Sequence, residues 1–535
     1  MDRIGLALMP KSHPLKSRVL DVFAPLILVI VTAFASLRQE DIRFWDESLY
    51  LERGFSLGFG AQPSWEWNPL YTDMYWLLGQ FFTDPIDLYF AGRATTAVLI
   101  VLAVWISLRI FTGPGIAITG ALVMAALPIT YVWPGVSSPS AGFLLVALAV
   151  AWRWRTVWAY VASSSIIWLA AATRPEFVWA ALAASIIVAI VVGAVVLRRS
   201  IHTGTALLLG LGLIATPMVL LIAYGNPFDL GTRSWEAFTQ HYELRFATAD
   251  DDPWQIDADI VGRDFPGATS VFAAVNANPA AFLMHVGRNM ATLPISAGGH
   301  FVGFGGTSST QNVVGIVTAV LWVAAVFIAI FRSRVESRAL AAQIWRAINT
   351  RRSLGALLLT VTTLGAALIS TLVIYPRPHY LVFLVAALVV VSGYVMHGLL
   401  SNRIKVWIPI TAVAIVSAAV LATNIAATLT GDANSATYAK SLRIMNQSAT
   451  DWILLTPERP VDIYLSNGQQ ILYPTNEDSS FAELLEVNQV NAVFDGILFR
   501  QAPYAGLEDF DSFIENPESF GFSPVIPGSP FLIRE

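Results

Sequence analysis

Long apolar segments are the feature that most constrains how this chain can fold. A helix that crosses a bilayer needs roughly 20 mainly apolar residues. Eleven segments approach or meet that requirement, with approximate bounds 22–37, 93–111, 115–133, 140–152, 157–173, 177–197, 204–223, 311–331, 355–374, 381–400 and 406–428. Charged residues make up only 13% of the chain, whereas about 25% is usual in soluble domains. The sequence therefore predicts an α-helical polytopic membrane protein and excludes a soluble enzyme, a disordered scaffold and a fibrous protein.

The distribution of charge predicts how the bundle is oriented. If the N-terminus is cytoplasmic, the inside segments hold 17 of the 32 basic residues but only three of the 37 acidic residues. Short inside loops that are almost purely basic fit the positive-inside rule. We therefore expect a multi-pass protein of the cytoplasmic (inner or plasma) membrane. Its eleven spans place the C-terminal region on the extracytoplasmic side.

Three large regions are expected outside the membrane, at about 38–92, 224–311 and 431–535. The last one changes composition sharply, so we divide the chain into a transmembrane module, 1–430, and a small soluble α/β domain, 431–535. Within that domain, strands are expected at 461–465, 493–498 and 524–533, and a helix at 481–485 behind Ser479 or Ser480 as its cap. Residues 438–452 have apolar positions at helical spacing, with Trp452 on the same face.

The first outside region carries two adjacent acids, Asp46 and Glu47, a few residues after the first span. Acids at a helix start are favoured by the helix dipole, which is the simplest explanation for the pair. The alternative is a carboxylate held just above the membrane, where it can accept a proton from an attacking hydroxyl. Further along, Asn68 and Tyr71 lie in a Trp-rich turn, and an aromatic stretch at 75–82 predicts an interfacial helix. Arg93 follows at the entrance of the second span.

Two short outside turns carry arginines in apolar surroundings. One contains Arg174 and Glu176, and the other contains Arg377, His379 and Tyr380. A charge at a helix end can simply extend towards water, and Arg174 and Glu176 can simply pair with each other. However, prolines on both sides of Arg377 stiffen its turn, and a rigid guanidinium with a nearby His and Tyr suits a phosphate group.

The sequence gives little support for a nucleotide, metal or cofactor site. There is no Walker loop, dinucleotide fingerprint or zincin helix, and no cysteine for a disulfide or thiolate site. Asp250, Asp251 and Asp252 leave a divalent cation possible, but clustered loop acids are usually just solvated, and the histidines of this region lack ligand spacing. We therefore predict no metal site and no cofactor. The net charge of −5 gives no indication of a nucleic-acid partner.

Taken in order, these motifs resemble those of the GT-C membrane glycosyltransferases. The shared features are an N-terminal span, an outside loop with an Asp-Glu pair, an Asn-Pro-Leu-Tyr turn, interfacial helices and an Arg before the second span. The turns at 174–176 and 377–380 also resemble those of the bacterial family-39-like group, akin to protein mannosyltransferases and the aminoarabinose transferase of lipid A. The resemblance implies a polyprenyl-phosphate-linked sugar donor and an inverting transfer on the extracytoplasmic face.

The predicted function is therefore transfer of a sugar from a polyprenyl-phosphate donor to an envelope glycan, lipid or protein acceptor, in contact with membrane lipid. By this resemblance Asp46 is the expected general base, and Glu47 orients the acceptor or shares that role. Arg377, with Arg174 and Arg93, is expected to hold the lipid phosphate. The alternatives are a lipid-linked oligosaccharide polymerase or flippase, or a structural partner in the envelope. A flippase should line its spans with polar residues, which these spans lack.

Overall fold

The computed structural model describes residues 14–37, 41–198, 202–229, 232–246, 258–302, 320, 323–324, 353–400, 437–471, 480–496, 499–501 and 506–534. Nine of the predicted spans coincide with helices in these ranges: α1 (Pro14–Ser36), α4 (Pro85–Phe111), α5 (Pro114–Ala126), α6 (Ser137–Trp154), α7 (Val157–Thr173), α8 (Val178–Leu197), α9 (Thr203–Tyr224), α16 (Leu354–Val373) and α17 (Pro378–Leu400). The expected spans at 311–331 and 406–428 lie almost entirely outside the described residues. Among those described, six helices are long and apolar enough to cross a membrane. The predicted class, an α-helical polytopic membrane protein, is confirmed.

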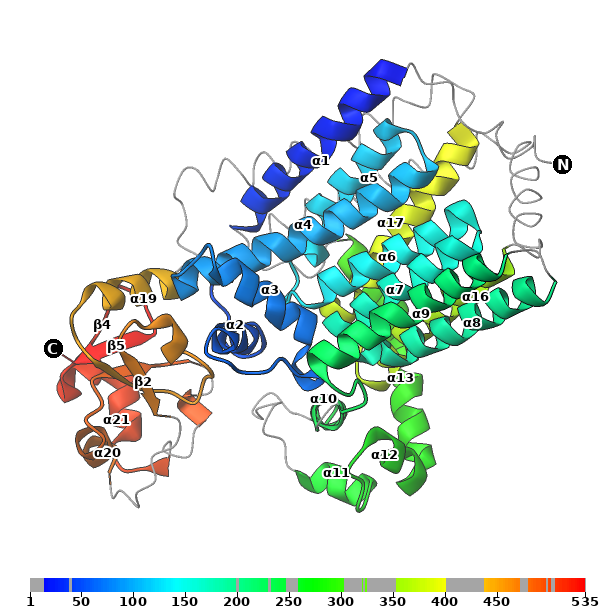
Figure 1. Ribbon diagram of the computed structural model, residues 1–535. Helices are drawn as coiled ribbons and strands as arrows, with labels where there is room; N and C mark the ends of the chain where they lie inside the picture. Colours follow the sequence, from blue (N-terminus) through cyan, green and yellow to red (C-terminus); the bar gives the residue numbers. More distant parts are fainter. Residues whose placement is uncertain are drawn as a thin grey trace.

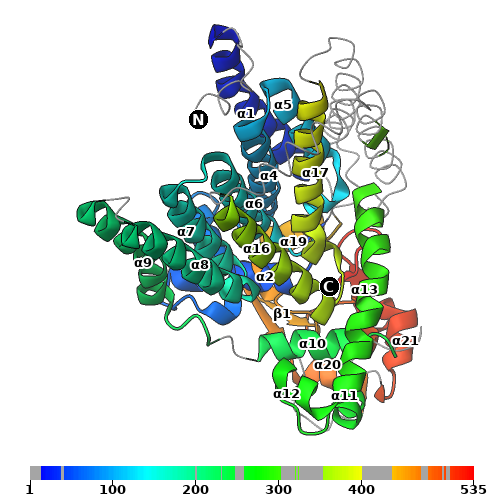
Figure 2. The same ribbon diagram turned by 90° about the vertical axis from the view of Figure 1, so that its right-hand side faces the viewer.

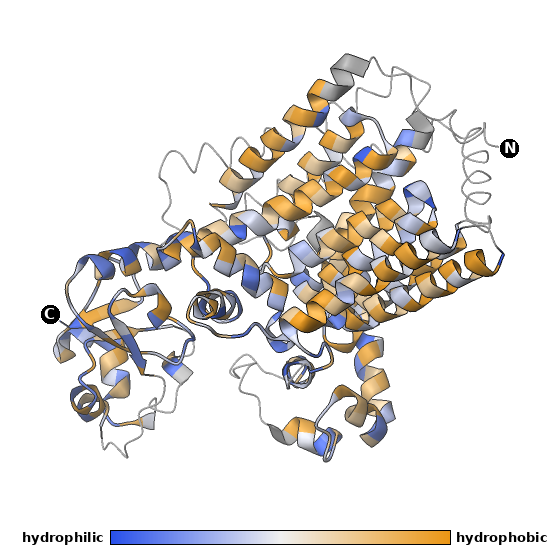
Figure 3. Cartoon of the chain, viewed as in Figure 1, coloured by the Kyte–Doolittle hydropathy of each residue, from blue (hydrophilic) through white to orange (hydrophobic). Residues whose placement is uncertain are grey.

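These helices pack side by side in one bundle (Figures 1 and 2). Helix α6 is central, because it contacts α4, α7, α16 and α17. The core between the helices is apolar, and large side chains on the outer face of the bundle remain exposed, such as Ile190 and Ile222 of α8 and α9. The long helices are accordingly apolar along most of their length (Figure 3). This is the pattern expected of a bundle whose outer surface contacts lipid.

Short helices and turns gather at one end of the bundle. They are α2 (Asp46–Leu57), η1 (Trp65–Trp67), α3 (Pro69–Gly79), η2 (Pro128–Tyr131), η3 (Pro175–Phe177), α10 (Arg233–Glu243), α11 (Ala258–Asp264), α12 (Val271–Ala277) and the start of α13 (Pro279–Val302). Side-chain contacts join this end together. The Trp65 indole donates to the Gly225 carbonyl just after α9 at 3.0 Å, and His285 of α13 lies 2.9 Å from the Val373 carbonyl at the end of α16.

The C-terminal region forms a small α/β domain at the same end (Figure 1). Its sheet has the order β2-β1-β3-β5-β4, with β1 parallel to β2 and β3, and β5 antiparallel to β3 and β4. The elements are α19 (Thr437–Gln447), β1 (Trp452–Leu455), η5 (Asp462–Tyr464), β2 (Gly468–Ile471), α20 (Phe481–Val487), β3 (Ala492–Phe494), η6 (Phe499–Gln501), α21 (Phe510–Glu515), η8 (Pro517–Phe520), β4 (Phe522–Pro524) and β5 (Phe531–Arg534). The domain boundary expected at 430/431 lies outside the described residues.

Some local predictions for this domain are confirmed and others are wrong. The 481–485 helix exists, and the Ser480 hydroxyl caps it by accepting from the Glu483 N–H at 3.2 Å. The strand expected at 461–465 is wrong, because Tyr464 belongs to a 3₁₀ turn that turns its hydroxyl towards Ser48, 2.6 Å away. The helix ends at Gln447, so Trp452 lies in β1 instead, although its indole donates to the Met445 carbonyl at 3.0 Å.

The arrangement of the helices gives a direct test of orientation. Arg198 lies at the C-terminal end of α8, opposite the end that carries the C-terminal domain and its exposed Ser466. Since the chain has no cysteine, single cysteines can be placed at both positions. We expect Arg198→Cys to react with an impermeant maleimide only from the cytoplasmic side, and Ser466→Cys only from the outside. Labelling of both from the same side would contradict the bundle.

Candidate active site

Among the described residues at the domain end of the bundle, Glu47 is the most buried charged group. It has no exposed surface. It accepts hydrogen bonds from the Tyr71 and Tyr75 hydroxyls, and its second oxygen accepts from the Gly135 backbone N–H at 2.7 Å. Burial, followed by the nearby charge of Glu47, raises the pKa of both tyrosines well above the usual value, so both remain protonated donors. Three donors offset the cost of burying one carboxylate.

Two glycines let helices close in around Tyr75. A Cβ at Gly54 of α2 would lie 2.5 Å from the Cβ of Tyr75, and one at Gly92 of α4 would lie 2.5 Å from its ring. Side chains at either position would therefore push α2 or α4 away from α3. The close approach holds the Tyr75 hydroxyl on Glu47 and fixes the start of α2, where Asp46 lies.

Asp46 faces a different environment from Glu47, although the two are adjacent. Its side chain is 37% exposed, and its Oδ1 lies 3.2 Å from Nη2 of Arg233 at the start of α10. The same guanidinium lies 3.4 Å from the Tyr50 hydroxyl and stacks over the Trp67 ring at 4.2 Å. The exposed carboxylate of the pair is thus Asp46, held in place by an arginine from a distant part of the chain.

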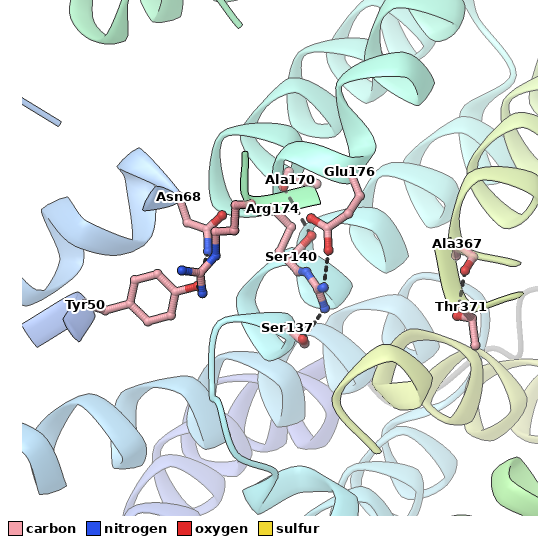
Figure 4. Close-up of polar contacts among 10 residues, drawn as sticks. Tyr50, Asn68, Ser137, Ser140, Ala170, Arg174, Glu176, Ala367 and Thr371 are labelled. Carbon is pink, nitrogen blue, oxygen red and sulfur yellow. Dashed lines mark hydrogen bonds and ion pairs between the residues drawn. The ribbon is translucent and has the colours of Figure 1, made fainter. Parts of the chain in front are cut away.

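Asn68 supports this arrangement from the start of α3. It occupies the left-handed region with φ of 55°, which Asn tolerates well, and Pro69 then begins the helix. Its side-chain amide donates to the Tyr50 hydroxyl at 2.5 Å (Figure 4). Tyr50 packs edge-on against Tyr71 with ring centroids 5.1 Å apart. Asn68 and Tyr71 therefore position the side chains around Asp46 and Glu47.

The Arg174 turn is built as an ion-pair network. Its guanidinium donates to the Ser137 hydroxyl and pairs with Glu176, as Figure 4 shows, and it lies over the Tyr380 ring at 4.6 Å. The simple pairing of Arg174 with Glu176 that the sequence left open is present. The stacking on Tyr380 also brings this turn to the Arg377 turn, about 200 residues further along the chain.

Burial lowers the pKa of Arg377, and the nearby negative charge of Asp46 partly opposes that shift. Its turn is tight: the Arg377 N–H donates to the Tyr375 carbonyl at 2.8 Å, and Pro378 begins α17. His379 is buried beside it and packs at a tilt against Tyr380, with ring centroids 4.2 Å apart. Burial and the Arg377 charge lower the pKa of the neighbouring His241 to about 3, so this histidine is neutral.

The Arg93 side chain connects α4 to η2. It is buried in α4, its Nη2 donates to the Tyr131 carbonyl at 3.0 Å, and it lies 6.0 Å from the Tyr89 ring. Within the described residues no group of three or more His, Asp or Glu side chains could hold a metal ion. The acids at 250–252 lie outside those residues.

Sequence analysis missed Arg233, Tyr50 and Trp67 as parts of this site. Arg233 had a usable signal: like Arg174 and Arg377, it is a basic residue beside aromatics in a region expected outside the membrane. Nothing in the sequence connects it to Asp46, which lies 187 positions earlier. Only the folded arrangement of α2 and α10 brings the two charges together.

Fold and site together define a class: a polytopic membrane protein with its polar cluster at the end of an apolar bundle. The chain is similar to ArnT from Cupriavidus metallidurans bound to undecaprenyl phosphate, with a TM-score of 0.50 and 14% identity over 96% of this chain and 97% of that one. The apo Archaeoglobus fulgidus oligosaccharyltransferase also matches, with a TM-score of 0.41 and 13% identity over 88% of this chain and 69% of that one. No protein-family profile and no curated protein matches the sequence.

The environment of Glu47 predicts a structural penalty when its charge is removed. Glu47→Gln replaces one acceptor oxygen with an amide donor, which then faces either the Gly135 N–H or the two tyrosine hydroxyls. We expect it to lower the free energy of unfolding in detergent by about 1–3 kcal/mol, the typical cost of a buried group left without a partner. Tyr71→Phe, which removes only one donor, should cost less. A Glu47→Gln protein of normal thermal stability but no activity would instead place Glu47 in the chemistry.

Proposed function

We propose that this chain is a glycosyltransferase that moves a sugar from a polyprenyl-phosphate donor to a hydroxyl acceptor on the extracytoplasmic face. One observation carries the proposal. Residues from positions 46, 174, 233 and 377 converge at the end of an apolar bundle, where they combine an exposed carboxylate with three guanidinium groups. The likeness in fold to ArnT, which was crystallised with undecaprenyl phosphate, supports the same substrate class. The narrower family-39-like assignment rests on the sequence motifs.

In the proposed reaction Asp46 is the general base. The acceptor hydroxyl attacks the anomeric carbon, its proton passes to the Asp46 carboxylate, and the bond between that carbon and the phosphate oxygen breaks. The sequence left the choice between Asp46 and Glu47 open. Burial and three hydrogen bonds favour Glu47 as a fixed support, whereas Asp46 has exposed surface.

The departing polyprenyl phosphate needs positive charge on the same side. Arg377 is our main candidate, because its turn is stiffened by prolines and its charge interacts with that of Asp46. Arg174 and Arg233 lie around Tyr380 and Tyr50 and add to the positive field. Such fixed charges stabilise a developing phosphate most strongly where water is excluded. In this scheme Arg93 does not bind the phosphate but connects α4 to Tyr131 of η2.

Asp46→Asn tests the base. The substitution keeps the size of the side chain but removes proton acceptance, and a general base typically contributes about 10²–10⁴-fold in rate. We expect turnover to fall by that order, with the protein folded, membrane-inserted and able to bind donor. The measurement is transfer of labelled sugar from polyprenyl-phosphate donors by purified variants. Normal turnover in Asp46→Asn would remove this carboxylate from the mechanism.

Arg377 variants test the phosphate site. Arg377→Lys keeps the charge but loses the planar two-point fork, so donor binding should weaken partly, and Arg377→Ala should weaken it strongly. The measurement is the KM for donor at fixed acceptor. Arg500→Ala is the matched control, since Arg500 pairs with Asp495 at 2.7 Å in the C-terminal domain. A normal KM for Arg377→Ala at limiting donor would show that this guanidinium does not bind the phosphate.

A further inference from the structure

Trp45, the residue before Asp46, has an unusual backbone conformation. Its φ is 70° and its ψ is −127°, a region that glycine adopts readily and other residues rarely. Trp45 directly precedes Asp46, the first residue of α2, so the backbone conformation of Trp45 sets the position and direction of the Asp46 side chain. A residue other than glycine keeps this backbone conformation only where the surrounding structure holds it there.

The contacts that hold Trp45 come from the C-terminal domain. The Trp45 backbone N–H donates to the Arg459 carbonyl at 2.5 Å, and its indole N–H donates to the Glu458 carboxylate. On the other side of Trp45, Phe44 stacks on Tyr438 of α19, with ring centroids 5.9 Å apart and an interplanar angle of 4°. The domain therefore accepts hydrogen bonds from both the backbone and the side chain of Trp45, the residue before Asp46.

The segment that provides these contacts, 456–461, is itself fixed to the sheet. Gln470 of β2 donates through its amide to the carbonyls of Thr456, at 3.2 Å, and Glu458, and it accepts from the Val461 N–H at 3.0 Å. Thr456 and Val461 are fully buried. One side chain thus ties the segment to β2 at three points, which makes it a firm support.

We infer that the 456–461 segment is a positioning element for Asp46, with Glu458 and the Arg459 carbonyl acting through Trp45. This inference rests on the proposed function, and it assigns the C-terminal domain a role in turnover. Glu458 is a positioning residue, since the contact through which it acts on Asp46 is the one it makes with Trp45. A shift of about 1 Å in a reacting group is enough to cost up to roughly 10²-fold in rate.

The test separates positioning from simple adhesion of the domain. Glu458→Ala removes the acceptor, Glu458→Gln keeps an oxygen that accepts from the indole, and Trp45→Phe removes the donor. Arg443→Ala is the matched control, because Arg443 of α19 pairs with Asp87 of α4 at 2.7 Å and joins the same two parts of the chain elsewhere. For each variant, kcat and the KM for donor are measured, together with amide hydrogen exchange of the segment 44–49.

We expect Glu458→Ala and Trp45→Phe each to lower kcat by about tenfold with little change in KM. The double variant should be no worse than either single variant, because both break one contact. Glu458→Gln should retain most of kcat, Arg443→Ala should be close to the unaltered protein, and only Glu458→Ala and Trp45→Phe should speed exchange at 44–49. An equal loss in Arg443→Ala, multiplicative losses in the double variant, or normal kcat and exchange in Glu458→Ala would each overturn the inference.

Failure of the proposed function gives a different result. In that case the unaltered protein transfers no sugar from any polyprenyl-phosphate donor tested. The exchange measurement still decides whether the domain holds Trp45, because it needs no substrate. Faster exchange at 44–49 in Glu458→Ala but not in Arg443→Ala supports the positioning contact, and unchanged exchange in both contradicts it.

Discussion

The buried carboxylate of Glu47 joins the parts of the chain on which the polar end of the bundle depends. Its donors come from Tyr71 and Tyr75 of α3 and from the backbone at Gly135, between η2 and α6. One side chain of α2 therefore connects the short helix α3 to the segment that precedes the long helix α6. A carboxylate without these donors would be costly at such a site, so the hydrogen bonds and the packing of α2, α3 and α4 stabilise one another.

The geometry of an α-helix explains how two adjacent acids acquire different surroundings. Consecutive residues on a helix point in directions about 100° apart, so Asp46 and Glu47 meet different neighbours. The conformation of Trp45 and the contacts of its side chain set the rotation of α2 at its start. With that rotation Glu47 faces α3, and Asp46 faces Arg233 of α10. The domain contact at Trp45 and the buried carboxylate thus fix the same helix from two sides.

Much of the fold follows from local sequence properties. Apolar length predicted nine helices that the structure describes, and the Asp-Glu pair and the two Arg-Pro turns marked where the polar cluster lies. Adjacent residues of like charge give no signal for which one turns inward, so burial of Glu47 was not predictable. The pairing of Asp46 with Arg233 and of Trp45 with Glu458 depends on tertiary contacts across 187 and 413 positions. The apolar alternation at 461–465 suggested a strand, but the segment forms a 3₁₀ turn that buries Val461 and Tyr464, three positions apart, instead of every second residue.

The charges of the cluster suit the proposed reaction at both of its ends. Apart from Glu47, whose carboxylate is held by three hydrogen-bond donors, the cluster of Arg174, Arg233, Arg377, Asp46 and Glu176 has a formal charge of plus one. Burial and the Arg377 charge lower the pKa of His241 to about 3, so His241 adds no charge. A polyprenyl-phosphate sugar is a phosphodiester with one negative charge, which this excess balances. When the proton reaches Asp46, the carboxylate becomes neutral and Arg233 loses its charged partner. The leaving polyprenyl phosphate then has a charge near −2, as phosphate monoesters do at neutral pH. The cluster has gained one positive charge at the same moment, so negative charge moves from the carboxylate to the phosphate without leaving the site unbalanced.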